Sequence, residues 1–255
     1  MDDRLHVTLV ANAGLLLEYK GTKLLLDGIY GTEGHPFSNL SPELFQQMKD
    51  GAPPFDDVDV LLFTHAHPDH FSPEMTLEYL RQRRVKGVFA PDTRTVAESG
   101  LKAFLQEEKI PSALLSDETD RIGYRITPEI TVRAFRTLHL DKQFEKVKHF
   151  CYLITFGEKT VLFTADIDYV TEDLSRLNGL RLDAVFINPL FFSVLRQEKF
   201  FRGKLNTDRI VVYHVPFAED DSMGMRARME HDLAQWGADR TPVTALKEPF
   251  RTLEL

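Results

Sequence analysis

The sequence predicts an α/β fold in which two β-sheets are sandwiched between helices, formed by one domain over residues 1–255. The main observation is the order of the patterns, because β-rich stretches alternate twice with stretches in which short apolar runs are separated by helical periodicity. Composition agrees with this, since 43% of residues are hydrophobic and 27% are charged. These values are ordinary for a globular protein that folds throughout its length.

The first β-rich stretch is expected to begin with a strand over residues 5–10 and to continue as a hairpin. Its two apolar runs cover residues 14–19 and 23–27, and Gly21 between them can supply a left-handed turn position. From residue 58 the pattern changes to βαβ units. The predicted elements are a strand at 58–64, a helix at 73–84, a strand at 87–90 and a helix at 92–107. Residues 28–54 are interpreted as a long irregular stretch.

The second half repeats this order. Four strands are predicted at residues 121–126, 130–138, 150–156 and 160–164, with a turn at 157–159. They are followed by a helix near 171–177, strands at 182–187 and 209–213, and a helix near 222–236. Several of these strands end directly before a histidine or an aspartate, which becomes important below.

The net charge disfavours certain partners, and the cysteine content excludes certain covalent and metal sites. The formal net charge of −8 disfavours nucleic acid and anionic lipid as partners. No apolar run reaches the roughly 18 to 20 residues of a membrane span, and the acidic start at Met1 lacks the basic region of a signal peptide, so a cytoplasmic protein with no membrane partner is expected. Cys151 is the only cysteine, which rules out an intramolecular disulfide and a thiolate metal cluster.

A short loop carries three histidines and an aspartate, directly after the strand at 58–64 and directly before the helix at 73–84. Ser72 is a candidate N-cap followed by Pro73, so we expect both ends of the loop to be held rigidly. Imidazole nitrogens with carboxylate oxygens are ligands of zinc and related metals, whereas magnesium and calcium prefer oxygen alone. The loop therefore predicts a transition-metal site with the ligands His65, His67, Asp69 and His70.

Three later strands also end in a candidate ligand, namely His139, Asp166 and His214. Because ligands in open α/β sheets bind beyond the carboxyl ends of the strands, these residues could meet the loop at 65–70. Seven ligands would suffice for two metal ions. His149 competes with His139, which is favoured because it follows its strand directly; the alternative reading of His149 is a surface or strand-edge residue. Asp168 is the less favoured alternative to Asp166.

The spacing His65-x-His67-x-Asp69-His70, followed in order by a histidine, an aspartate and a histidine, resembles the metallo-β-lactamase fold hydrolases. The resemblance extends over nearly the whole chain and implies a four-layer αβ/βα sandwich of two mixed β-sheets flanked by helices. It also implies two divalent ions bridged by Asp166, the first also held by His65, His67 and His139. The second would be held by Asp69, His70 and His214.

Departures from subgroups of this family narrow the resemblance. Enzymes that hydrolyse β-lactams usually carry a cysteine where Asp166 stands, and the flavodiiron branch usually carries a glutamate where His67 stands. The stretch between Asp166 and His214 is too short for the inserted domain of the mRNA-cleaving branch, and no long glycine-rich arm is present. The chain looks most similar to the L-ascorbate-6-phosphate lactonase-like and ribonuclease Z-like groups.

Residues around the predicted centre have two interpretations each. Asp27 resembles the family's aspartate behind the metal ligands, and it could equally form an Asp-Gly turn. The stretches 28–54 and 189–208 could form pocket walls; in the second, however, aromatic and basic residues are more typical of an amphipathic helix with a solvated basic face. The remaining histidines, His6, His35 and His231, are interpreted as structural or surface residues, although His35 could line the pocket.

The function predicted from these residues is a metal-dependent hydrolase that uses a metal-bound hydroxide on a small anionic ester, lactone or phosphoester. Asp69 is the expected catalytic residue, because it could orient or deprotonate the water. Zinc is the expected metal, and manganese or iron is also compatible with these ligands. The sequence is compatible with a homo-oligomer as well. The alternatives are a phosphodiesterase or nuclease of the ribonuclease Z-like type and a non-catalytic metal-binding regulatory protein.

Overall fold

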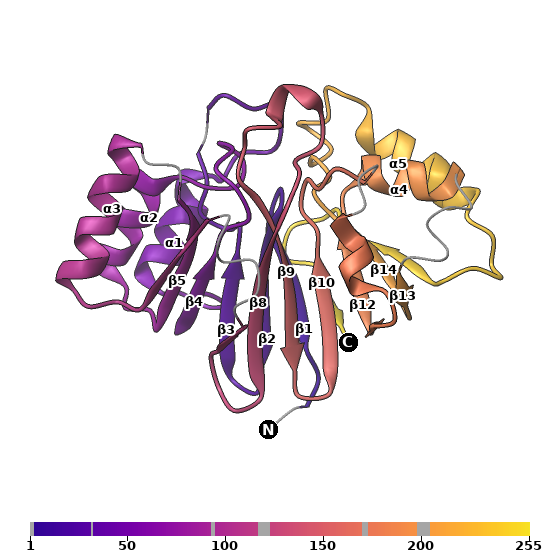
Figure 1. Ribbon diagram of the computed structural model, residues 1–255. Coiled ribbons are helices and arrows are strands. Elements are labelled where there is room, and N and C mark those ends of the chain that lie inside the picture. Colours follow the sequence, from indigo (N-terminus) through magenta and orange to yellow (C-terminus); the bar gives the residue numbers. More distant parts are fainter. Residues whose placement is uncertain (1–2, 32, 93–94, 117–122, 170–172, 198–204) are drawn as a thin grey trace. The chain divides into compact units, whose positions relative to one another are not determined.

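The structure is a computed structural model that describes residues 3–31, 33–92, 95–116, 123–169, 173–197 and 205–255. The chain divides into two compact units, the first formed by residues 1–116 with 249–254 and the second by residues 117–248 with 255. Each unit contains its own sheet and its own helices (Figure 1). That both belong to one domain stays a prediction.

The first unit is built on a mixed sheet with the strand order β16-β1-β2-β3-β4-β5-β6. Strands β1, β2 and β3 pair antiparallel, and β3 to β6 pair parallel. The described strands are β1 (His6–Ala11), β2 (Gly14–Tyr19), β3 (Thr22–Leu26), β4 (Val58–Leu62), β5 (Gly87–Pro91), β6 (Ser112–Leu115) and β16 (Thr252–Glu254). The predicted hairpin is confirmed, since Gly21 has a φ of 78° in the turn.

Three helices accompany this sheet, and Figure 1 shows them beside β4 and β5. They are α1 (Pro42–Asp50), α2 (Pro73–Gln82) and α3 (Val96–Glu107). The irregular stretch predicted for 28–54 is wrong over α1. The helix begins there because the Ser41 side chain accepts from the Leu44 N–H, Pro42 occupies the first turn, and Phe45 and Met48 are buried on one face.

The predicted helix at 92–107 begins too early. Thr95 is the N-cap of α3, and a reciprocal capping box joins it to Glu98, so the helix starts at Val96. The strands β6 and β16 were not predicted. β16 pairs antiparallel with β1, which lies at the opposite end of the sequence, and nothing in its three residues indicates such a partner.

The second unit is built on a mixed sheet with the order β15-β14-β12-β10-β9-β8-β7, and a two-stranded sheet joins β11 to β13. β7 to β10 pair antiparallel, whereas β10, β12, β14 and β15 pair parallel. Its described strands are β7 (Gly123–Arg125), β8 (Ile130–Thr137), β9 (His149–Phe156), β10 (Lys159–Phe163), β11 (Arg181–Leu182), β12 (Ala184–Ile187), β13 (Asn206–Thr207), β14 (Ile210–Val212) and β15 (Val243–Ala245). The predicted α/β class with two mixed sheets is confirmed.

Two α-helices, α4 (Pro189–Gln197) and α5 (Met225–Ala234), pack on this sheet and share its hydrophobic core. Residues 189–197 form a helix, as the amphipathic-helix interpretation predicts, but the predicted solvated basic face is wrong, because no residue from Pro189 to Arg196 is exposed. The pocket-wall interpretation is wrong for Phe191 and Phe192, because both are fully buried in the core. Arg196 forms an ion pair with Asp232 of α5. The pocket-wall candidates at 198–204 lie outside the described residues.

Two helix predictions in this unit need correction. The helix near 171–177 is a 3₁₀ helix over Asp173–Leu177, and residues 171–172 lie outside the described part. The helix predicted at 222–236 spans only Met225–Ala234. It begins at Met225 because Gly224 adopts a left-handed conformation and the Asp221 carboxylate accepts the first helical N–H groups. A further short 3₁₀ helix, η1 (Lys142–Phe144), was not predicted. No helix in the described part of the chain combines the length and the apolar character needed to cross a bilayer.

Candidate metal centre

In the first unit, the loop at 65–70 connects β4 to α2 and is held at several points. The Ser72 side chain caps α2 by accepting from the Met75 N–H, as the sequence predicts. Asn12, in the turn between β1 and β2, donates its side-chain amide to the Asp69 carbonyl at 3.0 Å. The N–H of Gly31 donates to the Pro68 carbonyl at 2.7 Å. The loop backbone is therefore held by two other segments of the unit, and the loop ends at the capped start of α2.

The four candidate ligands of this loop lie together. The ring centroids of His65 and His70 are 4.1 Å apart, and those of His65 and His67 are 4.7 Å apart. The Nε2 atom of His70 lies 3.5 Å from Oδ2 of Asp69. His65, Asp69 and His70 are buried and His67 is half-buried. The sequence prediction that a tight loop gathers these side chains is consistent with this geometry.

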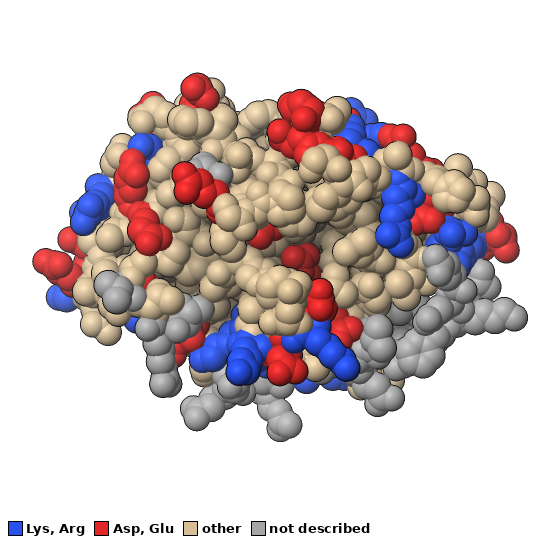
Figure 2. Space-filling view, turned by 90° about the horizontal axis from the view of Figure 1, so that it is seen from above, with Lys and Arg blue, Asp and Glu red and all other residues tan. Residues whose placement is uncertain are grey.

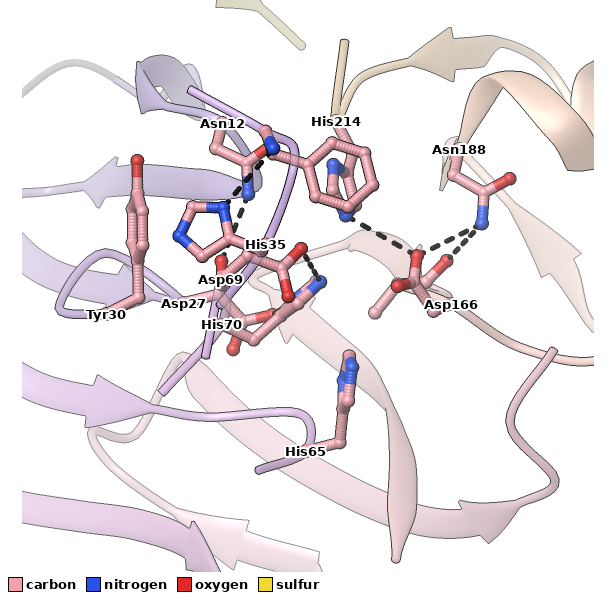
Figure 3. Close-up of polar contacts among 12 residues, drawn as sticks. Asn12, Asp27, Tyr30, His35, His65, Asp69, His70, Asp166, Asn188 and His214 are labelled. Carbon is pink, nitrogen blue, oxygen red and sulfur yellow. Dashed lines mark hydrogen bonds and ion pairs between the residues drawn. The ribbon is translucent and has the colours of Figure 1, made fainter. Parts of the chain in front are cut away.

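Asp27, at the end of β3, determines the orientation of two of these histidines. Its carboxylate accepts from the Thr64 N–H at 2.8 Å, from the Thr64 hydroxyl at 2.6 Å and from His70 Nδ1 at 2.8 Å. Figure 3 labels Asp27 next to His70. Since a carboxylate only accepts, the His70 proton sits on Nδ1, and the lone pair of Nε2 is available to a metal ion.

The same reasoning extends to His65. The Thr64 hydroxyl gives its hydrogen to Asp27, so it can only accept from His65 Nδ1, which lies 3.0 Å away. His65 therefore also carries its proton on Nδ1 and leaves Nε2 for coordination. Asp27 lies at a bend before Gly28 with a left-handed φ of 47°, and its carboxylate contacts His70. The two interpretations of Asp27 from the sequence therefore do not exclude each other.

In the second unit, three candidate ligands follow strands and converge on one carboxylate. His139 follows β8, Asp166 follows β10 and His214 follows β14. The Nε2 atom of His139 lies 3.7 Å from Asp166 Oδ2, and the Nε2 atom of His214 lies 3.6 Å from Asp166 Oδ1. Each oxygen of Asp166 thus faces a different histidine, which is the arrangement a bridging carboxylate requires.

His139 has the tautomer that metal binding needs. Its Nδ1 contacts the Leu140 carbonyl, an acceptor only, so Nδ1 carries the proton and Nε2 carries the lone pair. His214 has a left-handed φ of 59° although it is not glycine. Such backbone strain persists only where the surroundings enforce it and is concentrated at functional sites.

His149, the alternative third ligand, is positioned differently. Its Nε2 accepts from the Asp166 N–H at 3.1 Å, and its Nδ1 lies 2.6 Å from the Thr137 hydroxyl. Both ring nitrogens thus have protein partners, which supports His139 as the ligand. His149 is fully buried, so its interpretation as a surface residue is wrong; it starts β9 and pairs there with Thr137. Among the described residues, Asp166 and not Asp168 belongs to a group that could hold an ion.

The donor atoms of each unit fit a metal ion. Metal–nitrogen and metal–oxygen bonds of about 2.1 Å at tetrahedral angles place two ligand atoms about 3.4 Å apart. The three His–Asp separations of 3.5, 3.7 and 3.6 Å match this value. They exceed the usual 2.7 to 3.2 Å of an N–H···O hydrogen bond. Histidine nitrogens and carboxylate oxygens are a donor set for zinc, manganese or iron, so the chemistry of the residues also fits.

Three supporting residues were missed from the sequence, namely Asn12, Thr64 and Asn188. The Asn188 amide donates to Asp166 Oδ1 and to the Ala165 carbonyl, each at 3.2 Å, and Figure 3 shows it beside Asp166. A signal for Asn188 was available, because it follows a strand and precedes Pro189, as expected of a helix N-cap. Asn12 offered no such local signal. Among the other histidines, His6 is half-buried, His35 bonds within its own loop and His231 is exposed, in line with structural or surface roles.

Comparisons with known proteins identify the family. A model of the beta-lactamase superfamily domain matches residues 24–214. The chain is 26% identical over 159 residues to a 4-amino-L-phenylalanyl-[CmlP-peptidyl-carrier-protein] 3-hydroxylase of Streptomyces venezuelae, covering 62% of this chain and 28% of that protein. The chain thus spans only about a quarter of the length of this relative.

Two solved structures show the same fold. One is described as a possible metal-dependent hydrolase of Veillonella parvula, with a TM-score of 0.65, 14% identity and coverage of 98% of this chain and 99% of that one. The other is CmlA, a diiron β-hydroxylase of Streptomyces venezuelae, with a TM-score of 0.59, 20% identity and coverage of 100% of this chain and 55% of that one. The family model includes all the candidate ligands from His65 to His214, and the chain therefore belongs to the β-lactamase superfamily and has the metallo-β-lactamase fold.

Proposed function

We propose that this protein is a metal-dependent hydrolase with two divalent ions that acts on a small anionic ester, lactone or phosphoester. In this proposal the ligands of the two units meet at one centre and Asp166 bridges the ions. The first ion would be held by His65, His67 and His139, and the second by Asp69, His70 and His214. The observation that carries the proposal concerns the tautomers of His65, His70 and His139. The contacts of each ring place the proton on Nδ1, so Nε2 carries the lone pair that a metal ion requires.

When bound, two divalent ions would lower the pKa of a water molecule and polarise the scissile carbonyl or phosphoryl group. The carboxylate of Asp69 would orient that water and accept its proton. Asn12 supports this step, because it holds the Asp69 backbone through the carbonyl. The rigid hold on both ends of the loop keeps the carboxylate in place, as catalysis by orientation requires.

The charge of the centre is compatible with a small anionic substrate. Two ions contribute four positive charges, and the carboxylates of Asp69, Asp166 and Asp27 contribute three negative ones, because Asp27 lies against His70. One positive charge remains before the water ionises. Lysine and arginine side chains are interspersed with acidic ones on the face seen in Figure 2, and the formal net charge is −8. This distribution supports a small molecule over a long nucleic acid.

Zinc is proposed as the first choice of metal, with iron or manganese as alternatives. The donor set suits all three. CmlA is described as a diiron enzyme, which keeps iron in consideration for a chain of the same fold. Metal analysis of the purified protein distinguishes these ions, and two ions per chain are expected.

The test combines metal removal with one pair of variants. Protein loaded with zinc, manganese or ferrous iron is assayed against lactones, esters, thioesters, phosphoesters, cyclic dinucleotides and a structured RNA. Chelation and His67→Ala should each lower turnover by about a thousand-fold or more, since several kcal/mol of transition-state stabilisation are lost. His231→Ala removes an exposed histidine of α5 and should leave turnover unchanged.

Undiminished turnover in His67→Ala or in the chelated protein would refute the proposal. If the fully loaded protein left every compound untouched, the non-catalytic metal-binding alternative would replace it. Turnover of the RNA or the cyclic dinucleotide alone would instead establish the phosphodiesterase alternative.

A further inference from the structure

The turn that presents Asp166 has an unfavourable backbone conformation. Ala165 has a φ of 45°, in the left-handed region that non-glycine residues avoid at a cost of about 1–2 kcal/mol. Two backbone contacts hold the turn, since Leu140 donates to the Asp166 carbonyl at 2.8 Å and Ile167 donates to the Thr164 carbonyl at 3.2 Å. A strained turn keeps its conformation only if its surroundings determine it.

Asn188 determines the orientation of the carboxylate itself. Its Oδ1 accepts from the Phe191 N–H at 2.8 Å, so its amide nitrogen must be the atom that faces Asp166. That nitrogen donates to Asp166 Oδ1 and to the Ala165 carbonyl. Asn188 thus fixes the side chain of Asp166 but leaves its backbone N–H to another partner.

That partner is His149, and the contact determines its tautomer. A backbone N–H can only donate, so Nε2 of His149 accepts from Asp166 at 3.1 Å and carries no proton. The ring proton is then on Nδ1 and is donated to the Thr137 hydroxyl at 2.6 Å. The two histidines thus contact different parts of Asp166: Nε2 of His149 accepts from its backbone N–H, whereas Nε2 of His139 faces its carboxylate.

The hydrogen bonds continue beyond Thr137 and return to the same turn. The Thr137 hydroxyl lies 3.6 Å from Cys151 Sγ, and the Cys151 thiol donates to the Thr164 carbonyl at 3.6 Å. His149, Thr137 and Cys151 are all buried. A directed series of donors therefore runs from the Asp166 N–H through β9 and β8 and back to Thr164, and it connects both ends of the strained turn.

We infer that His149 is a positioning residue for the metal ligand Asp166, acting as the acceptor of its backbone N–H through Nε2. The inference rests on the proposed function in taking Asp166 as a ligand. The hydrogen bond keeps the turn in its strained conformation, so that Oδ1 and Oδ2 remain directed at His214 and His139. Residues that orient metal ligands typically contribute 10- to 100-fold to metal affinity, and we expect about this effect.

Two substitutions of His149 separate positioning from packing. His149→Gln can place a side-chain oxygen near the position of Nε2 and so keep an acceptor for the Asp166 N–H. His149→Asn places its amide near the position of Nδ1, which retains the Thr137 contact and loses the Asp166 contact. The two variants have opposite hydrogen-bonding consequences. Asparagine is smaller than glutamine, so a pure packing effect would also be larger in His149→Asn. A packing effect alone, however, gives no reason for the Asp166 amide to keep its protection from exchange in His149→Gln only.

The measurements are zinc affinity, by competition with a chromophoric chelator, and hydrogen exchange of the Asp166 amide in the metal-free protein. We expect His149→Asn to weaken zinc binding about 10- to 100-fold and to accelerate exchange at Asp166. His149→Gln should stay within about threefold of the wild type in both measurements, because it keeps the acceptor. Equal losses in the two variants, or unchanged exchange at Asp166 in both, would overturn the inference.

A third measurement uses the wild-type protein alone and decides the matter if the asparagine variant does not fold. Nitrogen NMR of the imidazole must show His149 protonated on Nδ1, and protonation on Nε2 would overturn the inference. Failure of the proposed function has a different signature. The wild type would then bind no divalent ion or turn over no compound, while the His149 tautomer and the protection of the Asp166 amide would remain as inferred.

Discussion

Replacement of Asp27 by asparagine should weaken zinc binding while leaving the fold of the first unit intact. Asp27 adopts a left-handed φ of 47°, which asparagine tolerates as well as aspartate does. The two side chains have nearly the same shape. The change is therefore confined to hydrogen bonding and charge, because one carboxylate oxygen becomes an NH₂ group that can only donate.

The expected magnitude follows from the three hydrogen bonds of Asp27. Its Oδ1 accepts from the Thr64 N–H, and its Oδ2 accepts from the Thr64 hydroxyl and from His70 Nδ1. If the asparagine oxygen keeps the backbone donor, its NH₂ faces His70, whose proton must then move to Nε2. Loss of this charge-assisted hydrogen bond costs about 1.5–3 kcal/mol, which corresponds to about a 10- to 100-fold weaker affinity for zinc.

Chelator competition with zinc measures this effect, and Asp59→Asn is the matched control. Asp59 is also a buried aspartate of the first unit, and it accepts from the Lys23 N–H at 3.0 Å and pairs with Lys86 at 2.7 Å. The same charge is removed there, and neither Lys23 nor Lys86 is a candidate ligand. An Asp27→Asn affinity within about twofold of the wild type would refute the tautomer argument, as would an equal loss in both variants.

Two predictions concern stability. Burial raises the pKa of Tyr79 to about 12, whereas an unfolded tyrosine titrates near 10. The contribution of the neutral Tyr79 side chain to the free energy of unfolding is therefore fully present below about pH 10, and it is lost as the pH rises through about 12. Urea unfolding at about pH 11 should therefore show the wild type losing about 1.4 kcal/mol relative to about pH 9, beyond any loss in Tyr79→Phe; parallel pH profiles would contradict this. Thr95→Ala should lower the free energy of unfolding by about 1 kcal/mol through loss of the capping box with Glu98, whereas Thr95→Ser should retain most of it, and equal stabilities would show that the cap contributes nothing.

The elements predicted correctly have strong local signals. The hairpin around Gly21 combines alternating apolar runs with a glycine in the left-handed region, and α2 combines the Ser72 cap with Pro73. The helix α1 had a signal of the same kind at Ser41 and Pro42, and it was missed because its surroundings were interpreted as a loop. By contrast, β16 has three residues and forms only because β1 offers an edge. Its existence depends on a partner far away in the sequence.

The candidate ligands could be recognised from the sequence because transition-metal ions are bound by only a few types of side chain. Three histidines beside an aspartate in one short loop are a distinctive combination of these types. Whether the ligands of the two units meet stays a prediction. What each side chain does within its unit was decided by tertiary structure. His139 and His149 are both histidines at strand ends, and only their hydrogen-bond partners distinguish a candidate ligand from a residue that holds the Asp166 backbone.

Sequence alone therefore determined which chemistry this protein can carry, since residue types and strand-end positions are local properties of the chain. Tertiary structure alone decided the protonated nitrogen of His65 and His70, the direction of the two Asp166 oxygens and the role of His149. The physical reason is that a tautomer is determined by the hydrogen-bond partners of the ring nitrogens, and the partners of His70 and His149 are distant from them in the sequence.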